Sequence, residues 1–199
     1  MRDSDIEGVV ALQRACFPEP FPAELLWTAE HLARHLEVCP AGQLVVVEGS
    51  SVLASASAAI VSEEVWQRHD PWHETLGGHF LTKHDAFGTT LYGVDISVHP
   101  DHRRKGLARA LYLARFELVR SLGLRRFGTG CRLPDFASWA AERGKADLGH
   151  YLTLVTEGTL VDRTLTPLSR LGLRLVGGIE NYMDDAESLN CAALLEWLP

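Results

Sequence analysis

Residues 91–111 constrain the fold of this chain more than any other segment. Residues 91–98 are mostly apolar and β-branched, the run ends at His99 and Pro100, and a short basic turn leads directly into a helix-forming stretch. A strand, a turn and a helix N-terminus in this order form an anion site, because backbone N–H groups converge in the turn and the helix dipole adds positive potential. Gly106 can adopt backbone angles that are closed to other residues, so a ligand can approach the main chain there.

The side chains of this turn fit a pyrophosphate-sized group. Arg103, Arg104 and Lys105 supply positive charge, and Ala108 keeps the first helical turn slim. The formal net charge of the chain is −7, yet eight of its 19 Lys and Arg residues lie in residues 102–126. This uneven distribution favours a compact anionic ligand over a nucleic acid. The alternative is a surface turn with solvated basic residues. Other phosphate-binding motifs, such as Gly-x-x-x-x-Gly-Lys-Ser/Thr, are missing from the sequence.

The spacing Arg103-x-x-Gly106-x-Ala108 after a strand resembles the acyl-CoA-binding motif of the GNAT superfamily of N-acetyltransferases. The resemblance is specific at residues 91–111 and looser over the rest of the chain. Residues 132–136, 162–173 and 180–185 resemble a GNAT subgroup that is sometimes fused to nitrilase-like amidohydrolases, although this chain contains no such hydrolase sequence.

The resemblance implies an α/β fold, a mixed sheet flanked by helices, in a single domain over residues 1–199. It implies an N-acetyltransferase that moves an acetyl group from acetyl-CoA to a primary amine of a small molecule, without a metal. The alternative is a domain that binds acyl-CoA as a sensor or partner module without catalysis. The cofactor-binding residues that the resemblance implies lie at the strand end and in the turn: Ile96, Ser97, Val98, Arg103, Arg104, Lys105, Gly106, Leu107 and Ala108.

Hydrophobic periodicity outlines the remaining elements. We expect helices at 4–16, 22–36, 107–122, 137–145, 148–157 and 165–171, and strands at 43–48, 52–61, 91–98, 126–131, 174–179 and 191–197. Residues 62–90 read as a long connection with about one helical turn. Trp66 and Trp72 in this connection either wall a substrate site or cover one end of the sheet. In the helix at 107–122, Leu111 is expected to face the core and Arg115 to point away from it.

The GNAT fold normally begins with a strand before its first helix, and residues 1–3 are too short to form one. The strand at 43–48 would then have an open, apolar edge. We expect one of three arrangements. The natural protein starts upstream of Met1, another segment covers this edge, or a partner subunit does so, as in a homodimer.

Two residues of strand 91–98 are candidates for the chemistry. The family resemblance implies that a backbone N–H at the end of this strand, that of Val98, binds the acetyl oxygen. Strict alternation along the strand would place Asp95 on a face with Gly93 and Ser97, beside a cavity or a polar network. In a confined site the pKa of Asp95 would be raised, which suits a general base acting through water. The alternative is a fixed anion that accepts hydrogen bonds from neighbouring loops.

The leaving-group acid and the acceptor-binding residues are harder to assign. The family often has a tyrosine four residues before a Gly-Phe pair, and here Leu168 occupies that position before Gly172. Because leucine cannot donate a proton, Tyr151 or Tyr182 would have to replace it, or the thiolate leaves unassisted. Arg132 follows the strand that splays from strand 91–98 in this fold. It either binds a carboxylate of the substrate or bonds loop carbonyls.

The cysteines and the hydropathy suggest a reducing compartment. The four cysteines are far apart and show no metal-ligand spacing, so we expect free thiols and a cytoplasmic protein. The histidines at 69–84 lack repeated ligand spacing, so we expect no metal site there. No apolar run reaches transmembrane length, so we expect no membrane partner.

Overall fold

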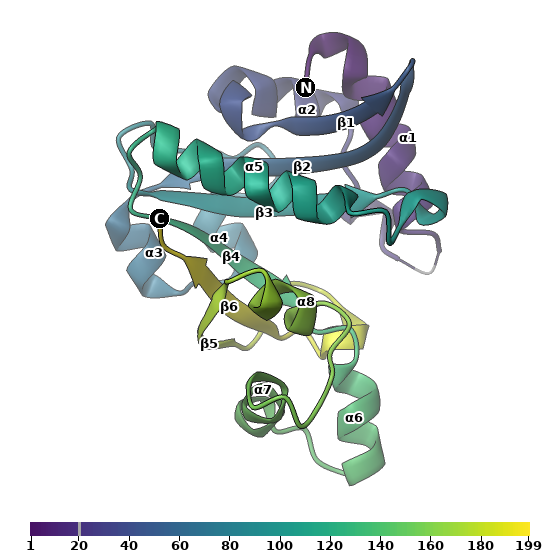
Figure 1. The fold of residues 1–199 in the computed structure, drawn as a ribbon, viewed down its shortest axis with the longest axis vertical. Coiled ribbons are helices and arrows are strands. Elements are labelled where there is room, and N and C mark those ends of the chain that lie inside the picture. The colour runs from purple at the N-terminus through teal and green to yellow at the C-terminus, as the bar shows by residue number, and fades with distance from the viewer. Residues whose placement is uncertain (20) are drawn as a thin grey trace.

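A six-stranded mixed sheet forms the centre of the computed structural model, which describes residues 1–19 and 21–199. The strand order is β1-β2-β3-β4-β6-β5. Strands β3 and β4 run parallel, and the other neighbouring pairs are antiparallel (Figure 1). The strands are β1 (Leu44–Glu48), β2 (Ser51–Val61), β3 (Thr90–Val98), β4 (Arg126–Arg132), β5 (Arg174–Ile179) and β6 (Ala192–Trp197).

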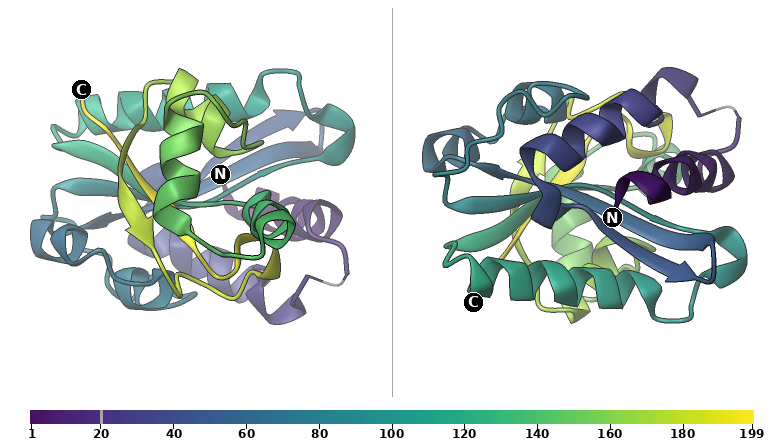
Figure 2. Two further views of the ribbon diagram at one scale, coloured as in Figure 1. Left: turned by 90° about the horizontal axis from the view of Figure 1, so that it is seen from below. Right: turned by 90° about the horizontal axis from the view of Figure 1, so that it is seen from above.

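Helices cover both faces of the sheet, so the predicted α/β class is confirmed. One face carries α1 and α2 with the short α3 and α4, and the other carries α5 with α6, α7 and α8 (Figure 2). The helices are α1 (Ile6–Cys16), α2 (Ala29–Val38), α3 (Glu63–Arg68), α4 (Trp72–Leu76), α5 (Leu107–Ser121), α6 (Phe136–Arg143), α7 (Leu148–Thr156) and α8 (Leu165–Arg170). Within the described residues, none of these helices combines the length and apolar character needed to span a bilayer.

Two stretches before β3 differ from the prediction. Helix α2 begins at Ala29 rather than at residue 22, because the Thr28 hydroxyl caps it by accepting a hydrogen bond from the His31 N–H at 3.2 Å. Residues 62–90 form two short helices, α3 and α4, rather than one helical turn. The sequence analysis left open whether Trp66 and Trp72 cover the sheet or wall a substrate site, and the structure assigns one role to each. Trp66 packs on the sheet beside Tyr92, whereas Trp72 lines a cavity described below.

The buried face of α5 corrects another expectation. Arg115 was expected to point away from the core, yet its side chain is among the most deeply buried in the protein. The Arg115 guanidinium donates hydrogen bonds to the carbonyls of Ser57, at 2.7 Å, and Asp95. Because residues four apart share a helix face, Arg115 lies directly after Leu111 on the stripe that packs against the sheet. The arginine is therefore a buried donor that ties α5 to two neighbouring strands.

A β-bulge in β3 receives this arginine. The pairing of β2 with β3 shifts after Ser57, so that Ser57 pairs with Asp95 and Ala58 pairs with Gly93. Val94 is thus an extra residue on β3, and an extra residue reverses the order in which side chains alternate beyond it. The bulge places two acceptor carbonyls, those of Ser57 and Asp95, within reach of one buried donor.

The bulge makes the predicted alternation along β3 wrong beyond Val94. Asp95 and Ser97 both accept hydrogen bonds from Gln13 of α1, whereas Ile96 and Val98 pack on the side of α5. The carboxylate of Asp95 therefore lies on the α1 side of the sheet, where α2 and α4 also pack.

Strand β1 lies at an edge of the sheet, and none of the described residues forms a strand on its outer side. The chain starts with a short 3-10 turn at Asp3–Asp5, and the amino group of Met1 donates a hydrogen bond to the Gln43 carbonyl at 2.9 Å. Val47 is 51% exposed on this edge. The absence of a strand before α1 in the described residues agrees with the sequence analysis. That another segment or a partner subunit covers the open edge of β1 stays a prediction.

Candidate active site

Strands β3 and β4 separate in the middle of the sheet. Residues 90–93 of β3 pair with residues 126–129 of β4, and the pairing ends there. The Thr129 hydroxyl donates a hydrogen bond to the Gly93 carbonyl at 3.1 Å where the separation begins. Beyond this point β3 stays paired with β2, and β4 stays paired with β6. One edge of β3 is therefore open from Val94 to Val98, as the sequence analysis expected for this pair of strands.

The open edge of β3 carries main-chain groups of Ile96 and Val98. The His99 N–H donates to the Leu53 carbonyl of β2 at 2.9 Å, and the hydrogen-bonding direction alternates along a strand. Ile96 and Val98 therefore face away from β2. In agreement, the Val98 carbonyl accepts hydrogen bonds from the Cys16 thiol at 3.2 Å and from Nε of Arg103 at 3.3 Å. The Val98 N–H faces the same edge, which suits an oxyanion donor.

A cavity of about 450 Å³ lies over the basic turn at the end of this edge. Gly106, at φ 83°, directly precedes α5, and a Cβ there would meet nothing within 4 Å. Arg104 also has a positive φ, 59°, which is uncommon for a residue other than glycine. The cavity is lined by Cys16, Phe17, Ile96, Ser97, Val98, Arg103, Arg104, Gly106, Leu107, Ala108 and Arg109. The structure thus gathers every predicted cofactor residue except Lys105 and adds Cys16, Phe17 and Arg109.

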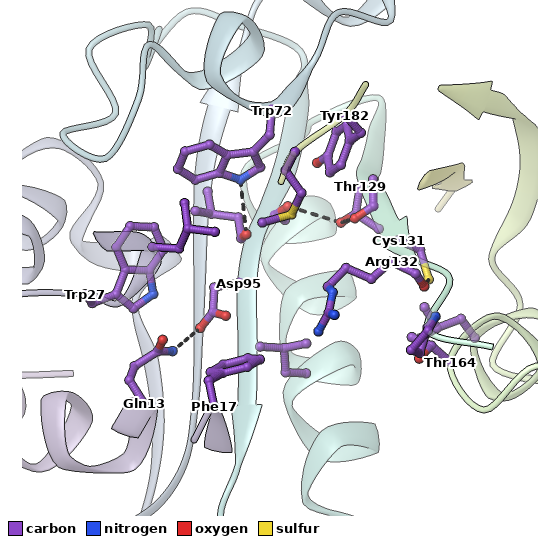
Figure 3. A pocket seen from close by; sticks show the side chains of 18 of the residues that line it. Gln13, Phe17, Trp27, Trp72, Asp95, Thr129, Cys131, Arg132, Thr164 and Tyr182 are labelled. Atoms are coloured by element: carbon purple, nitrogen blue, oxygen red, sulfur yellow. Dashed lines mark hydrogen bonds between the residues drawn. The ribbon is translucent and has the colours of Figure 1, made fainter. Parts of the chain in front are cut away.

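A second cavity, of about 290 Å³, fills the gap between β3 and β4 (Figure 3). Its walls come from the loops around α1 and α2, from α4 and the loop after it, from the facing ends of β3 and β4, and from α5 and α8. Phe17 and Ile96 line both cavities, so the two spaces meet beside the open edge of β3. A ligand bound at the basic turn and a second molecule in the deeper cavity would therefore meet next to Ile96.

Asp95 lies in the wall of the deeper cavity. Its Oδ2 accepts hydrogen bonds from Nε2 of Gln13, at 2.8 Å, and from the Ser97 hydroxyl, at 3.4 Å. Burial raises the pKa of Asp95 above its ordinary value of 3.8, although the Trp27 indole, the charge of Arg115 and these two hydrogen bonds act in the opposite direction. The predicted direction of this pKa shift is confirmed, and a carboxylate of raised pKa facing a cavity suits proton transfer.

The Arg115 guanidinium fixes the position of the Asp95 main chain. Replacing Arg115 by methionine keeps the aliphatic packing but leaves the carbonyls of Ser57 and Asp95 without their donor. Because an unpaired buried carbonyl costs about 1–3 kcal/mol, we expect Arg115→Met to lower the free energy of unfolding by about 2–5 kcal/mol. Urea unfolding, with the exposed Arg109→Met on the same helix as control, measures this difference. Equal stability of the two variants would contradict this role of Arg115.

Comparison with known proteins decides the family. The model of the acetyltransferase (GNAT) family matches residues 6–141. This chain belongs to the GNAT family. It is 35% identical over 195 residues to "Uncharacterized N-acetyltransferase YkwB" of Bacillus subtilis (strain 168), covering 98% of this chain and 85% of that protein. It is also 30% identical over 198 residues, 99% of this chain, to "Probable hydrolase YhcX" of the same organism, and it spans 37% of the length of that protein.

A solved structure agrees with the fold of this GNAT chain. The GphF GNAT-like decarboxylase in complex with isobutyryl-CoA superposes with a TM-score of 0.77 at 21% identity, covering 100% of this chain and 96% of that one. At this identity the likeness concerns the fold. Membership of the family supports acyl-CoA-dependent N-acetyltransferase activity, as the sequence predicts. The resemblance to the subgroup fused to nitrilase-like hydrolases stays a prediction.

Leu168 of α8, which the sequence resemblance places where many relatives have a tyrosine, lines the deeper cavity. Tyr151 does not line either cavity. It lies on the fully buried face of α7, and its hydroxyl donates a hydrogen bond to Oδ2 of Asp162 at 2.6 Å. This placement corrects the choice of Tyr151 as an acid, because helix α7 turns the ring into the core rather than toward β3.

Two other tyrosines do line the deeper cavity. Tyr182 faces it, but its hydroxyl shares a hydrogen bond of 3.0 Å with Tyr92. Tyr112 of α5 lies nearer the basic turn in sequence, and its hydroxyl is close enough to Arg115 to interact with it. Burial raises the pKa of Tyr112 to about 12, so the phenol carries its proton at neutral pH. Sequence reasoning missed Tyr112, although it follows Leu111 on the buried side of the helix.

Arg132, the predicted substrate-binding residue, lines the deeper cavity but is paired within the protein. Its Nε and Nη2 donate to the Asp185 carboxylate at 2.6 and 2.5 Å, and Nη2 also contacts Glu187 at 3.1 Å. Burial alone would raise the pKa of Asp185, but the hydrogen bonds and charge of Arg132 hold it below its ordinary value. The guanidinium is thus engaged by two carboxylates, rather than by loop carbonyls or an open substrate site.

The remaining wall was only partly foreseen. Trp27, Trp72 and His79 come together from loops and short helices that are distant from β3 in sequence. The many aromatic and histidine residues at 62–90 were the one sequence signal for this wall. No feature of the sequence pointed to Trp27 as part of it. Among the described residues, no cluster of three or more His, Cys, Asp or Glu side chains is arranged to hold a metal ion. Cys16, Cys39, Cys131 and Cys191 are free thiols.

Proposed function

We propose that this GNAT protein transfers an acetyl group from acetyl-CoA to the primary amine of a small molecule. The observation that carries the proposal is the meeting of two cavities beside the open edge of β3, one at an anion-binding turn and one that contains a carboxylate. The turn at 103–108 holds the pyrophosphate through backbone N–H groups and the charges of Arg103 and Arg104. The open main chain of Ile96 and Val98 pairs with the pantetheine amides as an added strand would.

Each chemical requirement of acetyl transfer then has a residue. The Val98 N–H stabilises the charge that develops on the acetyl oxygen. Asp95, on the side of the second cavity, accepts the proton that the amine loses, directly or through water. In place of Tyr151, we propose that the Tyr112 hydroxyl donates a proton to the departing thiolate, because this phenol faces the cavity and is protonated at neutral pH.

A second candidate function is acyl-CoA binding without catalysis, as a sensor or partner module. Leu168 favours it, because the family position that usually carries a tyrosine is apolar here. Asp95 opposes it. Burying a carboxylate in an apolar wall costs folding free energy, and a protein that only binds acyl-CoA has no use for that carboxylate.

Release of the CoA thiol distinguishes the two functions. Purified protein is mixed with acetyl-CoA and each member of a panel of primary amines, and free thiol is followed with a thiol-reactive dye. We expect at least one amine to accelerate thiol release well above the rate without amine, with an acetylated amine detected by mass spectrometry. Tight acetyl-CoA binding with no acceleration by any amine would support the binding module instead.

A further inference from the structure

The deeper cavity offers no free positive charge to a ligand. Two arginines line it. Arg132 is held by Asp185 and Glu187, and Arg115 is 1% exposed, with its Nη2 on two carbonyls and its Nε enclosed in the protein. No lysine lines the cavity within the described part of the chain. The pKa of His79 is lowered, by burial and then by His31 and His73, so its imidazole is neutral at neutral pH.

A negative charge does face the same cavity. Oδ2 of Asp95 accepts hydrogen bonds from Gln13 and Ser97, the Trp27 indole also donates toward this carboxylate, and the carboxylate lines the cavity. The carboxylate points into the space between α1 and β4 (Figure 3). The ion pairs behind this wall join Arg132 and Arg163 to Asp135, Asp185 and Glu187. With Arg115 and Asp95 included, three arginines face four carboxylates, one formal negative charge in excess. A cation is therefore favoured over an anion here, and a carboxylate would be buried without a partner.

The walls around Asp95 are aromatic. The rings of Trp27 and Trp72 lie 6.0 Å apart on one side, and those of Phe17 and Phe21 lie 4.7 Å apart and also line the cavity. Aromatic faces attract both apolar rings and cations. The cavity of about 290 Å³ is large enough for one aromatic ring with a short side chain.

The Trp27 indole lies beside Asp95 in this wall. Its ring is 6% exposed, and its N–H lowers the pKa of the Asp95 carboxyl by hydrogen bonding. Figure 3 shows this nitrogen facing the cavity beside Asp95. The indole N–H therefore helps to hold the Asp95 carboxylate at the cavity wall, where a ligand can reach it.

We propose that the acceptor is an aromatic primary amine that carries no carboxylate, bound with its ammonium group at the Asp95 carboxylate and its ring between the aromatic walls. The inference rests on the proposed function for the identity of the reactive group. It goes beyond that function by excluding amino acids and other carboxylated amines as preferred acceptors. Asp95 then recognises the ammonium and receives its proton, after which the neutral amine attacks the thioester.

A charge series with one aromatic body tests the proposal by calorimetry on protein saturated with CoA, so that no turnover is needed. The probes are 2-phenylethylamine, which is a cation, phenylalanine, which adds a carboxylate, and 3-phenylpropanoate, which is an anion. Propylamine keeps the ammonium and lacks the ring. We expect 2-phenylethylamine to bind about tenfold or more tightly than phenylalanine and propylamine, and 3-phenylpropanoate to show no saturable binding.

Variants assign the preference to Asp95. Asp95→Asn is expected to remove most of the advantage of 2-phenylethylamine, whereas Asp184→Asn, which removes an exposed carboxylate that lines neither cavity, keeps it. Binding of phenylalanine or 3-phenylpropanoate as tight as that of 2-phenylethylamine would overturn the acceptor class, and so would equal binding of propylamine or no binding of any probe. Thiol release with other amines would then still support the transferase. Conversely, 2-phenylethylamine that binds as expected without thiol release would overturn the catalytic function alone.

Discussion

Asp95→Asn is expected to cut turnover by about two to four orders of magnitude, the usual range for loss of a general base. The amide keeps an oxygen that can accept the hydrogen bonds of Gln13 and Ser97, but it cannot take a proton from the amine. The basic turn lies on the other side of the open edge, so the affinity for acetyl-CoA should change little. Steady-state thiol release and calorimetry with acetyl-CoA measure the two effects separately.

The pH profile and a stability measurement test the same residue further. Because burial raises the pKa of Asp95, the acidic limb of kcat/KM should lie above the ordinary aspartate value of 3.8 and disappear in Asp95→Asn. Asp184→Asn, which removes an exposed carboxylate, serves as the matched control. If Asp95 is instead a structural anion, the variant should lose thermal stability and keep its turnover per folded molecule. Full activity together with full stability would exclude both roles.

Gly106→Asp is expected to abolish acetyl-CoA binding, with a loss of about a hundredfold or more, because it puts a negative charge where the pyrophosphate is held. The added side chain itself meets no protein atom, since nothing lies within 4 Å of a Cβ at this position. A loss of binding would therefore come from the charge and bulk facing the ligand rather than from a clash within the fold. Calorimetry with acetyl-CoA measures the loss.

Gly123→Asp is a matched control at the other end of α5. Gly123 also has a positive φ, 65°, and open space around its Cβ, so the same substitution brings similar backbone strain and the same charge. Comparable melting temperatures for the two variants, with acetyl-CoA affinity lost only in Gly106→Asp, would assign the effect to the turn. Unchanged affinity in Gly106→Asp would refute the assignment of residues 103–108 to the pyrophosphate.

The parts of this molecule that could be predicted from the sequence are those determined by neighbours in the chain. The strand, basic turn and helix at 91–111 follow from an apolar run, a glycine and helix-forming residues, and the structure keeps all three. Arg115 could also have been found, because its spacing of four from Leu111 places it on the packed stripe of α5. The assumption that an arginine must face solvent outweighed that spacing.

The bulge at Val94 and the aromatic wall could not be predicted in this way. A bulge depends on how two strands align, and no residue type in β2 or β3 requires it at this position. Trp27 and His79 reach the cavity from segments about 50 residues apart in sequence, so their proximity depends on how the helices pack against the sheet. The prediction that Tyr151 is the leaving-group acid was wrong for the same reason, since only packing decides which way helix α7 turns its tyrosine.

The meeting of the two cavities at Phe17 and Ile96 also determines the order of events in catalysis. In the proposed reaction, donor and acceptor bind in different cavities and can occupy the protein at the same time, so no acetylated enzyme is needed between them. Cys131, a thiol in the wall of the deeper cavity, is an unsuitable relay, because burial raises its pKa and its Sγ–H donates to the Arg132 carbonyl at 3.2 Å. Initial rates measured at several fixed amine concentrations should therefore give intersecting rather than parallel double-reciprocal lines, the kinetic pattern of a ternary complex.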